Sequence, residues 1–298
     1  MALVIDSVRK FPAGFDFQNL RPMPWTESVV MCRPDYFSVV DVKNPFMASQ
    51  QGKVDSDLAL RQWENLKAVF ERIGVKVHLI PPSENREDMV FCANQTFVGI
   101  DENGRKVCVP SHMRHPSRQQ EVPAFRNWFQ QQRYLVEDIG TESTLFEGGG
   151  DALWHPQHGL IWGGVGSRTQ SEIYAALSEK FQVPVITLKM RAERFYHLDT
   201  CFCLIDRRTV LVYPEAFDEA GLKLIQSVFE RVLMVGEKEA QNMACNAAAF
   251  FGKYIVIQKG STETLDALKD LGYEVIEVET SEFMRSGGSV YCLKMGMF

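Results

Sequence analysis

The strongest constraint on the fold is a structural unit that recurs five times along the chain. In each unit a helix-like segment precedes a short apolar strand, and a second strand-like run with a polar or reactive residue follows. A repeat of this length is typical of solenoids, propellers and other arrays. The first strands are Val75–Ile80, Tyr134–Ile139, Val183–Leu188, Arg231–Gly236 and Tyr273–Val278, and the second runs surround Asn94, Glu147, His197, Asn246 and Cys292. If the units are related by rotation, these residues converge on one axis, where a cysteine, a histidine and a glutamate meet.

Helical patterns occupy the remainder of each unit. In the first, apolar residues of Asp57–Ile73 recur near a period of 3.6, Asp55 or Ser56 can cap the helix, and Gly74 can end it. The strands are rich in Val, Ile, Tyr and Phe, so helix and strand alternate and the fold class is α/β. The run Ser28–Val42 is predicted as a strand that completes the ring with material from the last unit. The other predicted helices are Gln119–Gln131, Thr169–Phe181, Pro214–Glu230 and Thr262–Leu271.

Composition narrows the choice of partner. The 298 residues are 45% hydrophobic, enough for a sizeable core, and no Pro/Ser/Gly-rich linker interrupts them, so we expect one domain over residues 1–298. The formal net charge of -6 argues against nucleic acid and anionic membranes as partners and allows a small cationic substrate. No segment approaches the roughly 20 apolar residues of a membrane span, which favours a cytoplasmic protein. The sequence leaves a homo-oligomer open.

One of the seven cysteines has unusual neighbours. The odd number and the scattered positions do not match a disulfide scaffold, and most of the cysteines lie among apolar residues, where a free thiol behaves as a small hydrophobe. Cys292 instead follows glycines and serines in RSGGSVYC. A nucleophilic cysteine needs backbone room for its substrate and a base or electropositive neighbour. Cys292 is therefore a candidate nucleophile.

Two further motifs carry acid and base groups. If YHLDTCF is an extended strand, His197 and Asp199 point to the same face, so that one can act as acid or base while the other orients it; the alternative is a hydrogen-bonded core histidine. Glu147 opens EGGGD, whose glycines indicate close approach of a backbone or ligand, or else an ordinary turn. Neither this run nor GGVGSRT has the spacing of a phosphate or dinucleotide loop.

Two sets of residues could also be read as zinc ligands. These are His155 with His158, and His197 with Cys201 and Cys203. Neither has the spacing of a structural zinc site. We therefore expect no metal and no other cofactor.

Taken together, FEGGGDAL, HLDT and the late cysteine in GGSVYC resemble the guanidine-modifying enzymes of the pentein superfamily, which include arginine deiminase, dimethylarginine dimethylaminohydrolase, the amidinotransferases and the arginine dihydrolases. The resemblance extends from CRPDYF and NPFM to the C-terminus. It implies a five-bladed α/β propeller of ββαβ-type repeats, with the active site on the pseudo-fivefold axis. This expectation agrees with the repeat.

The resemblance also implies roles for the residues. Cys292 would attack the guanidinium carbon and form an S-alkylthiouronium intermediate, while His197 would protonate the leaving amine and then activate water. Glu147 and Asp199 would hold the guanidinium nitrogens and His197. Arg118 in PSRQQE and Arg168 in GSRT match positions that contact the substrate carboxylate, a task that suits a bidentate guanidinium. Asn44 in NPFM and Ser286 are further expected substrate-binding residues.

One difference from the deiminase sequence pattern bears on which product the enzyme releases. Deiminases carry an aspartate in the sequence FTRD, whereas this chain has Asn94 in VFCANQTFV, as the dihydrolases do. An asparagine offers both a donor and an acceptor, so it can hold a cationic guanidinium or a neutral ureido product. The glycine run of EGGGD is also one residue longer than the deiminase pattern, which leaves the spacing of Asp151 open.

We therefore expect a cysteine-dependent hydrolase of the guanidinium group of arginine or a close derivative, with arginine dihydrolase chemistry preferred. The alternatives are an arginine deiminase, a dimethylarginine dimethylaminohydrolase, an amidinotransferase and a non-catalytic, ribosome-binding member of the superfamily. The last has no need for Cys292, His197, Glu147 and Asp199 together.

Overall fold

The computed structural model describes residues 2–141, 143–191 and 194–298. Within them the strands form five small sheets, and each sheet contains an antiparallel pair followed by a parallel third strand. β1 (Val4–Ile5) adds to one sheet by pairing in parallel with β9. The sheets are β16-β2-β3 (Met295–Met297, Ser28–Cys32, Lys76–Ile80), β4-β5-β6 (Thr96–Ile100, Lys106–Pro110, Leu135–Val136), β7-β8-β9 (Ala152–Trp154, Ile161–Val165, Val185–Lys189), β10-β11-β12 (Phe202–Leu204, Thr209–Val212, Arg231–Met234) and β13-β14-β15 (Ala248–Phe250, Tyr254–Gln258, Glu274–Val278).

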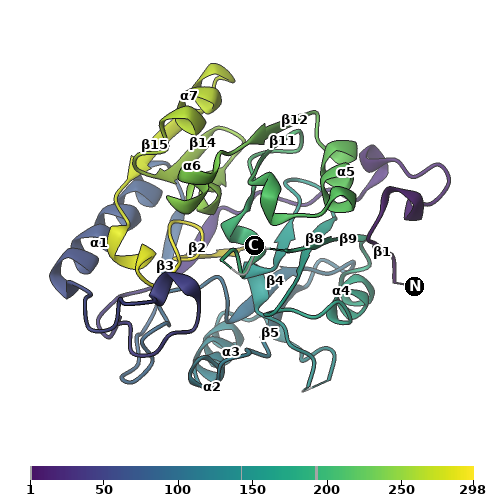
Figure 1. Ribbon diagram of the computed structural model, residues 1–298. Helices are drawn as coiled ribbons and strands as arrows, with labels where there is room; N and C mark the ends of the chain where they lie inside the picture. Colours follow the sequence, from purple (N-terminus) through teal and green to yellow (C-terminus); the bar gives the residue numbers. More distant parts are fainter. Residues whose placement is uncertain (1, 142, 192–193) are drawn as a thin grey trace.

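A helical crossover joins the two parallel strands of every sheet. Such a connection is needed because parallel neighbours cannot be linked by a tight turn. The crossover helices lie around the outside of the molecule and the sheets lie inside (Figure 1). They are α1 (Ser56–Arg72), α2 with α3 (Pro116–Gln119, Val122–Gln131), α4 (Ile173–Phe181), α5 (Glu219–Val228) and α7 (Thr262–Asp270). The loops contain the short helices α6 (Glu237–Gln241) and α8 (Ser281–Met284). They also contain the 3-10 turns η1 (Val8–Lys10), η2 (Phe17–Asn19), η3 (Pro45–Met47), η4 (Gly148–Gly150), η5 (Leu198–Thr200), η6 (Pro214–Ala216) and η7 (Ala244–Asn246).

The sequence predicts α1 closely. The Asp55 side chain accepts a hydrogen bond of 2.9 Å from the Leu58 amide, which satisfies a free donor of the first turn. Gly74 follows the helix with φ of +92°, a conformation that glycine adopts without steric cost. Trp63, Leu66 and Phe70 are buried on the inner face of α1.

Other predicted bounds were too long. The expected helix Gln119–Gln131 begins only at Val122, in α3, because Pro123 lies in its first turn; Gln119 is the last residue of the separate helix α2. The expected strand Ser28–Val42 ends at Cys32, and Pro34, which cannot donate to a ladder, follows. α4 begins at Ile173, after the predicted start at Thr169, and α5 begins after η6.

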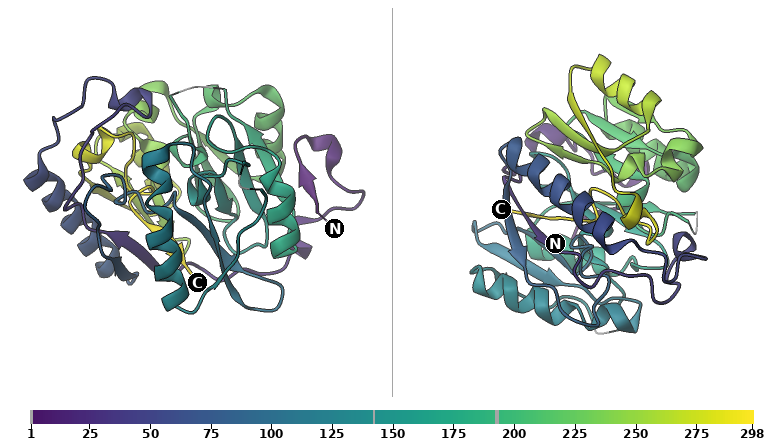
Figure 2. Two further views of the ribbon diagram at one scale, coloured as in Figure 1. Left: turned by 90° about the horizontal axis from the view of Figure 1, so that it is seen from below. Right: turned by 90° about the vertical axis from the view of Figure 1, so that its left-hand side faces the viewer.

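The predicted closure between the two ends of the chain is confirmed. The C-terminal strand β16 pairs antiparallel with β2, and Met295 lies opposite Val30. The last part of the chain therefore completes the sheet that begins near residue 28. In the left view of Figure 2 the yellow C-terminal segment lies apart from the first residues of the chain, so the closure is made through β2.

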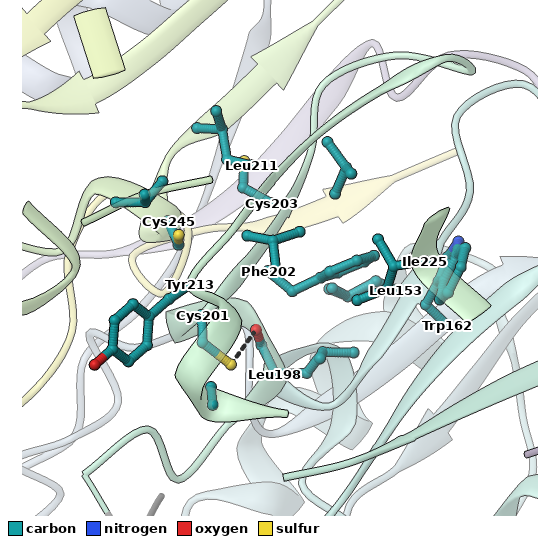
Figure 3. Packing of buried hydrophobic residues seen from close by; sticks show 14 of the residues in the cluster. Leu153, Trp162, Leu198, Cys201, Phe202, Cys203, Leu211, Tyr213, Ile225 and Cys245 are labelled. Carbon is teal, nitrogen blue, oxygen red and sulfur yellow. Dashed lines mark hydrogen bonds between the residues drawn. The ribbon is translucent and has the colours of Figure 1, made fainter. Parts of the chain in front are cut away.

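The buried hydrophobic residues of the described chain group into several clusters. Trp162, Phe202 and Leu211 pack with Cys201 and its neighbours in one buried cluster (Figure 3). The Cys201 thiol donates to the Leu198 carbonyl at 3.6 Å. All seven cysteines are free and buried, so the prediction that they form no disulfide scaffold is consistent with the packing. Among the described residues, no helix combines the length and the apolar character that a bilayer crossing requires.

Candidate active site

The five polar or reactive residues of the repeat lie in turns that lead into the inner strands β4, β7, β10, β13 and β16. All five are buried, with at most 2% of their surface exposed. The prediction that they lie in strands was wrong, because each unit bends into a turn before its inner strand begins. These residues are Asn94, Glu147, His197, Asn246 and Cys292.

His197 and Glu147 form a direct pair. The Glu147 carboxylate lies 2.6 Å from Nε2 of His197 and also accepts a 2.9 Å bond from Arg168. Burial opposes ionisation of Glu147, but the hydrogen bond from His197 and the charge of Arg168 outweigh it and hold its pKa below the usual range. Glu147 is therefore an anion that fixes the imidazole and leaves Nδ1 as the other ring nitrogen available to the site.

Asn94 lies on that other side of His197. Its Nδ2 is 3.4 Å from Nδ1 of His197, and its Oδ1 accepts a 3.0 Å bond from Arg118. Arg118 is itself held by Glu121, which also accepts a 2.7 Å bond from Gln95. Because Arg118 can only donate, it fixes the amide orientation, with the carbonyl toward Arg118 and the NH₂ toward His197.

Cys292 lies between a carboxylate and an amide. Its thiol donates to Oδ2 of Asp199 at 3.1 Å, and Nδ2 of Asn246 donates to the sulfur at 3.2 Å. Burial, then the charge and hydrogen bond of Asp199, raise the pKa of Cys292 well above its usual value. Burial raises the pKa of Asp199 to about 7, although the hydrogen bond from Cys292 acts against it. The free site therefore holds a thiol, not a thiolate.

Asp199 also has an unused acceptor. Its Oδ1 is buried without a hydrogen-bond partner among the described residues. A buried unpaired carboxylate oxygen is costly, so a positively charged N–H donor would be favoured there. His197 and Asp199 do not lie on one face of a strand as predicted, because η5 intervenes, but the turn still brings both to the site.

The glycines of EGGGD permit close packing. Gly148 has φ of +54°, and a side chain on it would collide with the backbone at Thr96. A Cβ on Gly150 would lie 3.2 Å from the His197 ring. Asp151 points away from this contact, because it accepts bonds from Thr169 and from the amide of Leu198. The predicted close approach is thus between backbone turns, and Asp151 supports the structure.

A pocket of about 290 Å³, counting the part open to solvent, lies beside Cys292 and Asn94. Arg168 stacks on Tyr196, with its guanidinium carbon 4.7 Å from the ring centre, and donates to the Lys43 carbonyl at 2.8 Å. The Asp88 carboxylate lies 3.1 Å from the ammonium of Lys43, so Arg118 and Arg168 are the guanidinium groups that face the pocket beside this ion pair. The lining of the pocket comprises Lys43, Asn44, Met47, Asp88, Phe91, Asn94, Arg118, Arg168, Tyr196, Ser286 and Cys292.

The structure thus groups every residue predicted for the site. Asn44 donates to the Ser286 carbonyl at 3.0 Å, so these two expected residues form one wall. Sequence reasoning missed Asn246 as a site residue, although its position in the fourth unit matches that of Asn94, Glu147, His197 and Cys292 in the others. It also missed Asp88, Lys43 and Tyr196, for which the repeat offers no signal.

The residues considered as zinc ligands have other contacts. His155 accepts a 3.1 Å bond from Trp162, and burial and neighbouring positive charge lower its pKa to about 3. The thiol of Cys203 donates to the Ala247 carbonyl at 3.3 Å. Across the described ranges no three His, Cys, Asp or Glu side chains group as metal ligands do.

The fold and the grouped thiol, imidazole and carboxylates place the chain in the pentein superfamily. Residues 33–298 match the sequence family described as N,N dimethylarginine dimethylhydrolase, eukaryotic, and the chain belongs to that family.

Relatives of known activity cover nearly all of this chain. The bifunctional arginine dihydrolase/ornithine cyclodeaminase AgrE of Nostoc sp. is 33% identical over 89% of the chain, which spans only 37% of that relative. The dimethylarginine dimethylaminohydrolase of Mycobacterium tuberculosis is 32% identical, with 91% of this chain and 86% of that protein covered. The N-terminal domain of ArgZ, a cyanobacterial arginine dihydrolase, has a TM-score of 0.86 and 31% identity in a crystal structure covalently bound to a reaction intermediate, with 91% and 97% covered.

Proposed function

We propose that the chain is a cysteine-dependent hydrolase of the guanidinium group of arginine, and that it hydrolyses the substrate twice to give ornithine. The observation that carries the proposal is the convergence of Cys292, Asp199 and the His197–Glu147 pair beside one small pocket. The activity of the relatives AgrE and ArgZ supports it.

The covalent step begins with substrate binding. A guanidinium beside Cys292 donates to the free Oδ1 of Asp199, and its positive charge lowers the pKa of the thiol that burial and Asp199 had raised. The thiol proton passes to His197, and the thiolate attacks the guanidinium carbon. The C–N bond to the departing group then breaks while His197 supplies the proton that this group needs.

Hydrolysis of the adduct uses the same histidine. His197 removes a proton from water, the resulting hydroxide attacks the carbon of the S-alkylthiouronium, and the C–S bond breaks. The product is a ureido group, and the sulfur returns to the thiol form. Glu147 stays ionised throughout and stabilises His197 whenever it carries a positive charge.

The preference for a second round rests on Asn94. Since Arg118 holds its carbonyl, Asn94 presents an N–H donor toward the site, and a ureido oxygen is an acceptor. A neutral product is therefore retained beside Cys292. The second attack breaks the C–N bond to the remaining terminal nitrogen, releases ammonia and leaves a thiocarbamate on Cys292. Water then cleaves the C–S bond, and the resulting carbamate loses carbon dioxide, so that each arginine gives ornithine, two molecules of ammonia and carbon dioxide.

A dimethylarginine dimethylaminohydrolase is the second candidate, because the chain matches that family over residues 33–298. Both activities share the first covalent step. They differ in the substituent on the guanidinium and in whether citrulline leaves. An arginine deiminase would also release citrulline, and an amidinotransferase would require an amine acceptor in place of water.

The architecture around this site belongs to the same proposal. We infer that the five sheets are the blades of an α/β propeller, that residues 1–298 form one catalytic domain, and that the turns before the inner strands meet on the pseudo-fivefold axis. The repeated order of antiparallel pair, crossover helix and parallel strand supports this inference. We further propose a cytoplasmic protein that needs no cofactor and has no nucleic-acid or membrane partner.

The test is a product balance. The protein is incubated separately with arginine and with asymmetric dimethylarginine, and ammonia, ornithine, citrulline and dimethylamine are measured together. Dihydrolase chemistry gives two ammonia molecules per ornithine and no accumulated citrulline. One ammonia and one citrulline per arginine would indicate an arginine deiminase instead. Dimethylamine formed from asymmetric dimethylarginine with a higher kcat/KM than arginine shows would indicate a dimethylarginine dimethylaminohydrolase. A Cys292→Ser variant is the control for contaminating activity.

A further inference from the structure

A second cavity lies within the ring of sheets. Its volume is about 970 Å³, counting the part open to solvent. Every inner strand contributes to its wall, through Phe97 in β4, Trp154 in β7, Phe202 in β10, Phe250 in β13 and Met295 in β16. The cavity shares no lining residue with the pocket beside Cys292. The two are therefore separate spaces on either side of the turns that carry the active-site residues.

Lys294 is the charged group of this cavity. It lines the wall, only 7% of its surface is exposed, and its ammonium lies 3.3 Å from the centre of the Tyr291 ring. Within the described residues the ammonium has no hydrogen bond and no ion pair, and no Asp or Glu lines the cavity. Burial lowers the pKa of Lys294 to about 8, although the negative charge of Asp199, which does not line the cavity, acts against it.

An unpaired buried ammonium is costly, and an anion beside it would recover part of that cost. The rest of the wall limits what the anion can be. Trp25, Phe97, Trp154 and Phe250 present aromatic surface, and His155 is neutral because its Nδ1 accepts from Trp162. One positive charge in an aromatic wall matches one negative charge on an apolar body. Inorganic phosphate or a dicarboxylate would leave charge unpaired against that wall.

We propose that this axial cavity is a binding site for a small organic monocarboxylate with an aromatic or aliphatic body. The carboxylate pairs with Lys294, and the body packs between the inner strands. The proposal goes beyond the hydrolase activity, since binding here requires neither Cys292 nor a guanidinium.

Calorimetric titration with benzoate tests the proposal, and benzamide and benzylamine serve as neutral and cationic probes of the same shape. We expect benzoate to bind at least about tenfold more tightly than either. Lys294→Met should weaken benzoate binding about tenfold or more and leave benzamide unchanged, whereas Lys294→Arg should retain most of the affinity. The exposed Lys259→Met is the matched control and should bind benzoate like the wild type.

A cavity-filling variant provides an independent arm. Ala249 lines the cavity, so Ala249→Leu should weaken benzoate binding while Lys294 is kept, and thermal unfolding reports whether each variant is folded. Equal affinity for benzoate and benzamide would overturn the proposal. The proposal would also be overturned if folded Lys294→Met and Ala249→Leu both bound benzoate as the wild type does. It would likewise be overturned if the wild type did not bind benzoate at millimolar concentration.

Discussion

The Asn94→Asp substitution gives the sharpest test of the proposed second hydrolysis. In the wild type Nδ2 of Asn94 faces the site, because Oδ1 is fixed by Arg118 at 3.0 Å. An aspartate keeps the bond to Arg118 and replaces the inward N–H donor by an acceptor. A ureido oxygen then loses a hydrogen bond and faces a negative charge, which costs about 1–3 kcal/mol. That free energy corresponds to a second step about 5- to 150-fold slower.

The first step should suffer less, since a guanidinium donates and pairs well with a carboxylate. Citrulline should therefore accumulate, and the ammonia released per arginine should fall from two toward one. Quenched-flow sampling with quantification of citrulline and ornithine measures both steps. Asn65→Asp, on the exposed face of α1, is the control for added negative charge. Two ammonia molecules per arginine with an unchanged rate of citrulline consumption in Asn94→Asp would refute the role given to this amide.

Further predictions concern the reacting groups. Cys292→Ser should lose turnover by at least about a thousandfold and still bind arginine by calorimetry, because the nucleophile is removed and the pocket is kept; turnover near the wild-type rate would exclude Cys292 as nucleophile. His197→Gln should accumulate a covalent adduct on Cys292, visible as added intact mass, since water is no longer activated; normal turnover without adduct would remove His197 from the mechanism. Glu147→Gln should lower the free energy of unfolding by about 3–5 kcal/mol, as it leaves Arg168 buried beside a neutral group. Folding lowers the pKa of Glu147, so the stabilisation from its charge is present above its ordinary pKa of 4.5 and is lost as the pH falls toward the folded value. The free energies of unfolding of the wild type and the variant should therefore converge in acid. A difference that does not shrink with falling pH would contradict this account.

The repeat made most of the architecture predictable. Helix α1 and the pairing of β16 with β2 follow from apolar periodicity and from the need to close the last sheet. The turns were not predictable from the same pattern, because a run such as YHLDTCFCLI has the composition of a strand throughout. Only packing against the neighbouring turns, with the glycines after Glu147 allowing close contact, bends the segment at His197.

The electrostatic partners were harder to predict than the reacting residues. Glu121 fixes Arg118 and thereby Asn94, yet in the sequence it is an ordinary acidic residue between two short helices. Its role depends on its burial against Arg118, at 3.2 Å. Burial raises the pKa of Glu121 to about 7, and the charge of Arg118 acts against this rise. No local pattern reports burial caused by distant segments.

The position of Asn246 shows how one scaffold supports an asymmetric site. It occupies the same place in its unit as Glu147 and His197 do in theirs, and it donates to Cys292 at 3.2 Å while its Oδ1 accepts from the amide of Ser289 at 2.9 Å. One asparagine thus orders both the nucleophile and the turn that carries it. Five corresponding turns, each before an inner strand, thus carry residues of different chemistry. A catalytic site that needs a thiol, a base and amide donors at close range can be assembled in this way from segments that are far apart in the sequence.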